Sequence, residues 1–139
     1  MQLKRLFLTT GKGLPLKTRI AVWFIFITTS LWVAWFLIGW GAIAGFEVSG
    51  DIDTFGFLLL ILIHLGPYPL AAYLLTRKSK RACIAAVSIL ILLLLDVNWR
   101  YPITAETLYR YTGFIFNFII LLPITLVMLD VRNYWKIAR

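Results

Sequence analysis

The sequence is short of the residue types that build soluble active sites. It has one histidine, His64, one cysteine, Cys83, and six acidic residues among 139. One cysteine excludes an intrachain disulfide, and no CxxC or His/Cys pattern with metal-ligand spacing occurs. The motifs GxSxG, HExxH and GxGxxG and the Walker lysine loop are also missing. We therefore expect no enzyme, no metal centre and no cofactor, and a buried structural Cys83.

Charge is scarce as well. Only 14% of the residues are charged and 61% are apolar, whereas a soluble domain is roughly a quarter charged. This balance indicates that lipid is the solvent. The net charge is +8, but the bases occupy short gaps between apolar runs rather than one patch. We therefore expect the lipid bilayer, and not nucleic acid, as the partner of this surface.

Long apolar runs dominate the remaining sequence, at about 20–46, 55–75, 82–99 and 111–129. A membrane-spanning helix needs roughly 20 such residues. The first run is longer, so it should tilt or project, and it is too long for the core of a cleavable signal peptide. With short connections, the pattern predicts a single all-α domain over 1–139, with four transmembrane helices in an up-down bundle.

The bases predict the orientation of these helices. Five lie in the N-terminal tail, 1–19, four in the connection at 76–81 and three in the C-terminal tail, 130–139. Only Arg100 and Arg110 fall on the other side. By the positive-inside rule both termini are cytoplasmic, in a multi-pass protein of a bacterial inner membrane. Aromatic residues near the predicted boundaries should lie at headgroup level, among them Trp99, Tyr134 and Trp135.

The first ten residues, MQLKRLFLTT, form a small amphipathic stretch of their own. Apolar residues at 3, 6 and 7 can share one face, and bases flank it. The stretch is typical of a short interfacial helix on the inner leaflet. A frayed tail is the equal alternative, because termini are often disordered.

The second run contains the breaker Gly66-Pro67-Tyr68-Pro69. Each proline removes a backbone N–H, which would leave the carbonyls of Ile63 and Leu65 without their usual donors. In lipid those carbonyls need another partner. We therefore predict a kink at Pro67 and Pro69 that faces protein or water.

His64 lies directly before this predicted kink. An ionisable residue at membrane depth is a functional candidate, as a proton relay, a haem ligand or a donor to a quinone. Bis-histidine haem ligation would need a second histidine from another chain. The favoured interpretation is a neutral structural histidine that hydrogen-bonds a carbonyl or hydroxyl between helices.

Three further polar residues, Asp96, Asn98 and Asn117, are expected at similar depth near the outer surface. Asp96 precedes Arg100 by four residues, which favours an ion pair along one helix. The alternative is an outward-facing polar pocket lined by Asp96, Asn98 and Asn117, with Arg100 beside it and His64 somewhat deeper, in which Asp96 would bind an ion or a substrate.

Small residues end the first run in GWGAIAGF, where Gly41 and Gly45 have GxxxG spacing, typical of helix packing. The leading functional hypothesis is a small accessory, assembly or interaction subunit that binds another membrane protein, or a second copy, through its transmembrane helices. The alternative is an oligomeric transporter or proton-conducting protein that uses His64 and Asp96. A third is a subunit of a redox complex that contacts haem or quinone through His64.

Overall fold

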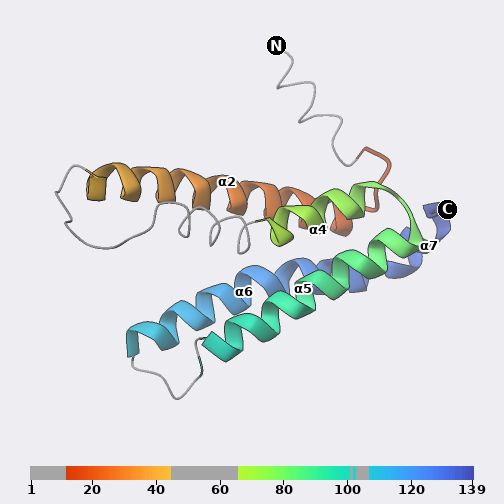
Figure 1. Cartoon of the computed structure of the whole chain (residues 1–139). Helices are drawn as coiled ribbons and strands as arrows, with labels where there is room; N and C mark the ends of the chain where they lie inside the picture. Colours follow the sequence, from red (N-terminus) through yellow and green to blue (C-terminus); the bar gives the residue numbers. More distant parts are fainter. Residues whose placement is uncertain (1–11, 45–65, 101, 103–106) are drawn as a thin grey trace, which may run out of the picture.

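The computed structural model describes residues 12–44, 66–100, 102 and 107–139, and within these ranges the chain is entirely helical apart from its turns. Its elements are labelled in Figure 1: α2 (Leu16–Ala44), α4 (Pro67–Thr76), α5 (Lys80–Arg100), α6 (Thr107–Leu129) and α7 (Val131–Ile137). The prediction of an all-α fold is confirmed for these ranges. The expected interfacial helix at 1–10 lies outside them.

Two of these helices are long and apolar enough to cross a membrane, α2 through Leu16–Ala34 and α5 through Lys80–Trp99. A third is added if Gly113–Leu129 and Val131–Ile137, which meet at a 62° bend, are counted together. These helices coincide with the first, third and fourth predicted runs. Of the second run only the end is described, so a complete four-span bundle remains a prediction.

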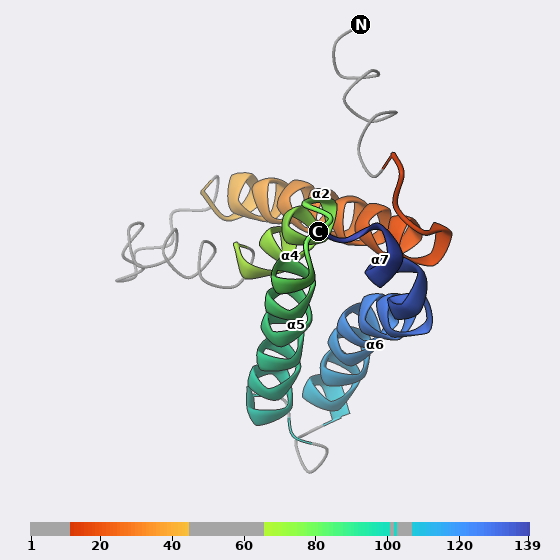
Figure 2. The same cartoon turned by 90° about the vertical axis from the view of Figure 1, so that its right-hand side faces the viewer.

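The helices pack in a ring, in which α2 and α5 each contact both α4 and α6. Chain direction alternates, since α2 and α5 leave the end of the molecule to which α4 and α6 return (Figure 1). The helices are nevertheless splayed, with α2 lying across the line of α5 and α6 (Figure 2). Buried apolar residues fill the contacts, among them Ala21, Val22, Ile25, Ala71, Ala72, Leu75, Cys83, Ala86, Leu90, Ile120 and Val127.

The prolines of the second run begin a described helix. Pro67 is the first residue of α4, and Pro69 lies in its first turn. At these positions a missing N–H costs no intrahelical hydrogen bond. Leu70 donates to the carbonyl of Gly66 at 3.1 Å and closes the turn. The residues that precede Gly66, with His64 among them, lie outside the described ranges, so the kink and the environment of His64 stay predictions.

Pro123 inside α6 leaves one backbone carbonyl without its intrahelical donor, and a side chain of another helix supplies a donor instead. A proline cannot donate to the carbonyl four residues earlier, which here belongs to Ile119. The Tyr68 hydroxyl on α4 donates to that carbonyl at 2.8 Å. This phenol therefore joins α4 to α6 at the point where α6 lacks its own hydrogen bond.

Candidate functional site

Two of the predicted polar residues meet between α5 and α6. The Asn98 amide donates to the Asn117 side-chain oxygen at 2.8 Å, and Asn117 donates back to the Asn98 oxygen at 3.2 Å. Asn98 also donates to the carbonyl of Leu94 at 2.8 Å. Both amides thus have partners within the protein. Such a reciprocal pair fixes two helices in register, because either amide alone would lose its partner in an apolar surrounding.

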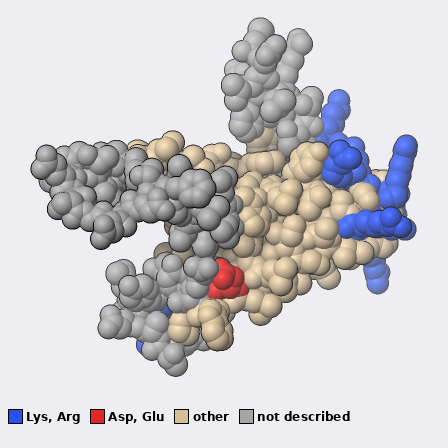
Figure 3. All heavy atoms as spheres, in the orientation of Figure 1, with Lys and Arg blue, Asp and Glu red and all other residues tan. Residues whose placement is uncertain are grey.

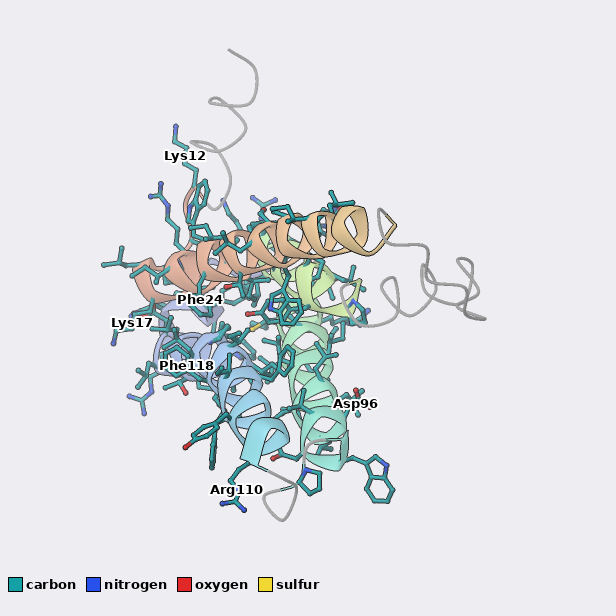
Figure 4. The ribbon with its side chains drawn as sticks, turned by 90° about the vertical axis from the view of Figure 1, so that its left-hand side faces the viewer. Lys12, Lys17, Phe24, Asp96, Arg110 and Phe118 are labelled. Carbon is teal, nitrogen blue, oxygen red and sulfur yellow. The ribbon has the colours of Figure 1, made fainter. Side chains whose placement is uncertain are left out.

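Asp96 does not point toward this pair. In Figure 4 its side chain lies on the side of α5 that faces away from α6. The reason is helical geometry, because residues two positions apart face nearly opposite directions. The structure therefore does not assemble the pocket of Asp96, Asn98 and Asn117. The side chain of Arg100 and the surroundings of Gly41 lie outside the described part, as does Gly45, so the ion pair with Asp96 and the GxxxG contact stay predictions.

The opposite end of the molecule gathers the bases, and we call it the basic end. It comprises residues 12–19, 76–81 and 130–139, which meet where α2 begins and α6 ends (Figure 1). Lys and Arg side chains crowd this end in the space-filling view (Figure 3). In Figure 4, Lys12 and Lys17 lie there, whereas Arg110 lies at the far end of α6. The bases of the basic end are Lys12, Lys17, Arg19, Arg77, Lys78, Lys80, Arg81, Arg132, Lys136 and Arg139.

A buried carboxylate, Asp130, holds the basic end together. It lies at the bend between α6 and α7 and is only 6% exposed. Its Oδ2 accepts the backbone N–H of Lys17 at 2.7 Å and that of Thr18 at 3.3 Å, and its Oδ1 accepts from the Asn133 side chain at 3.3 Å. The first turn of α2 contains no acid of its own. Asp130 therefore caps α2 from a position 113 residues away and places a negative charge at the positive end of its dipole.

The chain after Asp130 is docked and does not hang free. The Tyr134 hydroxyl of α7 is buried and donates to the carbonyl of Leu75, at the end of α4, at 2.8 Å. Burial raises the pKa of Tyr134 to about 12, because the phenolate would lose its hydration there. The backbone N–H of Arg139 donates to the carbonyl of Lys78 at 3.0 Å. The last ten residues are thus tied to the turn between α4 and α5.

That turn is conformationally unusual. Lys78 has a positive φ of 51°, and Gly13 has one of 84°. The Lys78 ammonium nitrogen lies so close to Gly13 that a Cβ added there would be 2.7 Å from it. A left-handed lysine is uncommon and persists only where surrounding contacts determine it. Here the bond from Arg139 supplies such a contact.

Two residues of the basic end depart from the expectations drawn from the sequence. Asp130 falls within the predicted basic tail and has no predicted role, although an acid at the boundary of an apolar run and among bases is a usable signal. Tyr134 is predicted at headgroup level, but it is fully buried in the protein because α7 bends back onto the end of α4. Trp99, by contrast, is 87% exposed, and its expected place at headgroup level stays a prediction.

Comparison with protein-family models, curated proteins and solved structures finds no match to this chain.

Proposed function

We propose that this protein is a small multi-pass membrane subunit that assists, assembles or stabilises another membrane protein by helix-to-helix contact. The basic end faces the cytoplasm, and the polar pair Asn98–Asn117 lies toward the opposite surface. The observation that carries the proposal is an exposed apolar seam on α5, described next.

The seam on α5 consists of Ile84, Ser88, Ile91 and Leu95, which recur at intervals of four, three and four residues and are exposed. Leu92 beside them is 65% exposed. This spacing is that of a helix that packs along another helix at a shallow angle. The small Ser88 at its middle would permit a close approach and offers a hydroxyl to a partner helix.

Helix lengths support the membrane placement. The 21 residues of α5 span about 32 Å, which matches a hydrocarbon core of about 30 Å. The 29 residues of α2 span about 44 Å, so α2 must tilt or project if α5 stands upright. Figure 2 shows α2 inclined to α5 in this sense. The basic end then lies at one surface, the side that the positive-inside rule assigns to the cytoplasm.

The alternative, conduction along polar residues, has less support. A conducting path needs polar groups that can exchange partners with an ion or proton. Asn98 and Asn117 bond each other, Tyr68 bonds a backbone carbonyl, and Asp96 faces away from α6. Asn98, Asn117 and Tyr68 therefore act as contacts that join helices.

The seam is tested by partner retention. The tagged chain is extracted in mild detergent, and the partner is identified and quantified by mass spectrometry. We expect Ile91→Ala with Leu95→Ala to reduce the retained partner strongly, because it removes exposed contact area without touching the core. The matched control is Leu70→Ala with Ile115→Ala, which removes one exposed leucine and one exposed isoleucine from two other helices and should leave retention unchanged.

Two outcomes would contradict the proposal. One is equal retention by the seam variant and its control. The other is proton or ion flux through the purified chain in liposomes that is lost with His64→Leu and Asp96→Asn while assembly persists. The second result would establish the conduction hypothesis instead.

A further inference from the structure

The basic end concentrates ten bases around one acid, and that acid is already occupied. Asp130 is the only acidic residue at the described basic end, and its oxygens accept two backbone N–H groups and the Asn133 amide. Like charges held on a folded surface repel one another, and an external anion relieves this repulsion. The surface is therefore suited to a negatively charged partner. The geometry of α7 indicates the chemical class of that partner.

The bases of α7 lie on one face of an anchored helix. Arg132 and Lys136 are four residues apart, so they share a face, and they are exposed. Tyr134 lies on the opposite face, where it is buried and bonded to the end of α4. Trp135, 36% exposed, and Ile137, 38% exposed, lie to either side of the bases. The helix is thus a fixed platform with charge at its centre and partly exposed apolar groups at its flanks.

The platform begins where an apolar surface ends. Met128 and Leu129, the last residues of α6, are exposed and apolar, and the chain bends by 62° immediately after them. The exposed apolar side chains at the end of α6 match the acyl chains of lipids. Arg132, Lys136 and the indole of Trp135 match the polar headgroup layer. An acidic protein surface would match the charge alone and would leave the adjoining apolar residues uncovered.

We propose that the basic end binds the phosphate groups of anionic lipids in the adjoining leaflet, with α7 as the platform and Arg132 and Lys136 as its main contacts. The inference rests on the membrane placement in the proposed function and not on the seam of α5. Partner retention and lipid binding are separate measurements, so either proposal can fail alone.

The test uses the full chain, purified in a neutral detergent and titrated with phosphatidylglycerol or phosphatidylcholine. Lipid retained after gel filtration is measured by phosphorus analysis, and the melting temperature by circular dichroism. We expect retention and thermal protection by phosphatidylglycerol alone. Arg132→Gln and Lys136→Gln should each weaken binding about five-fold, and the pair about 25-fold. Micelles avoid any effect of the lost charges on insertion.

The controls separate charge from shape and position. Arg110→Gln removes the same charge at the far end and should bind as the wild type does. Arg132→Lys with Lys136→Arg keeps the charge and should stay within about two-fold of the wild type. These variants keep the test decisive even if the paired glutamine variant loses helicity.

Four results would overturn the inference. They are equal retention of both lipids, unchanged binding by the two single glutamine variants, equal protection by inorganic phosphate at the same concentration, and tighter binding of polyglutamate than of phosphatidylglycerol. The third result would indicate a site for a free anion, and the fourth a site for an acidic protein segment.

Discussion

Replacing Asp130 should loosen the first helix from the rest of the protein. Its carboxylate accepts one short hydrogen bond, at 2.7 Å from Lys17 N, and two longer ones at 3.3 Å. A hydrogen bond to a charged group contributes about 1.5–3 kcal/mol, and an anion at a helix N-terminus adds about 0.3–1 kcal/mol. The exposed Lys17 lets water replace part of this loss. We therefore expect Asp130→Ala to lower the free energy of unfolding by about 2–3 kcal/mol.

A graded series checks the reasoning. Asp130→Asn keeps an oxygen that can accept one N–H but loses the charge, so it should cost about half as much as Asp130→Ala. Asn133→Ala removes only the 3.3 Å bond to Oδ1 of Asp130 and leaves the cap on α2 in place, so its cost should be clearly smaller. Unfolding in detergent is followed by circular dichroism. Hydrogen exchange gives a local readout, since the amide protons of Lys17 and Thr18 should exchange faster in Asp130→Ala.

The capping interpretation would be refuted if Asp130→Ala and Asn133→Ala cost the same. It would also be refuted if the amide protons of Lys17 and Thr18 stayed protected in Asp130→Ala. Equal cost would mean that Asp130 stabilises the chain only through its bond with Asn133. Unchanged protection would mean that the first turn of α2 is held by other contacts.

Three further predictions concern the other joining contacts. Tyr68→Phe should lower the free energy of unfolding by about 1 kcal/mol. In a Pro123→Ala background it should cost almost nothing, because residue 123 then donates its own N–H to the carbonyl of Ile119. A double-mutant cycle in detergent measures this coupling, and additive costs would contradict it. Asn98→Leu or Asn117→Leu alone should lower the free energy of unfolding by about 1 kcal/mol. The double change should restore most of the stability, because no amide is then left unpaired. The same unfolding assay applies, and a double variant less stable than both single variants would contradict this prediction. The raised pKa of Tyr134, about 12 against an ordinary 10, means that the folded chain retains this proton where the unfolded chain loses it, so its stabilising contribution is complete below pH 10 and declines as the pH rises toward 12. The stability difference between wild type and Tyr134→Phe should therefore shrink over that interval in unfolding curves at fixed salt, and a constant difference would contradict the assignment.

Depth along a membrane helix can be predicted from the sequence, but depth alone does not give the direction around the helix. Asn98 and Asn117 are expected at one depth because the third run leads outward and the fourth returns, and the two amides do meet. The expected pocket adds Asp96 on depth alone, whereas the Asp96 side chain lies on the side of α5 that faces away from α6. Residues two positions apart on a helix face opposite ways, so Asp96 and Asn98 lie on different sides of α5. Counting positions around the helix, which needs only the sequence, separates them.

The contacts at the basic end cannot be predicted in this way. Asp130 reaches the start of α2 across 113 residues, and Tyr134 reaches Leu75 across 59. Neither contact can be predicted from neighbouring residues in the sequence. Both depend on which helix ends come together and on how far the chain bends after Leu129. The sequence does show two backbone groups that lack a hydrogen-bond partner within their own helix and are met by such long-range contacts. The first turn of α2 has no acid, and Pro123 leaves the carbonyl of Ile119 without a donor.

In a membrane helix such deficits are costly, because lipid offers no hydrogen bonds. Unpaired backbone groups can therefore be located in the sequence itself. They occur at helix starts without a cap and at carbonyls four residues before a proline. Each one predicts a polar side chain elsewhere in the chain, near the same depth. For this protein the search leads to Asp130 for α2 and Tyr68 for α6. Applied to the second run, it predicts that the carbonyls of Ile63 and Leu65, beside His64, also have a polar partner on a neighbouring helix if the helix continues through Pro67.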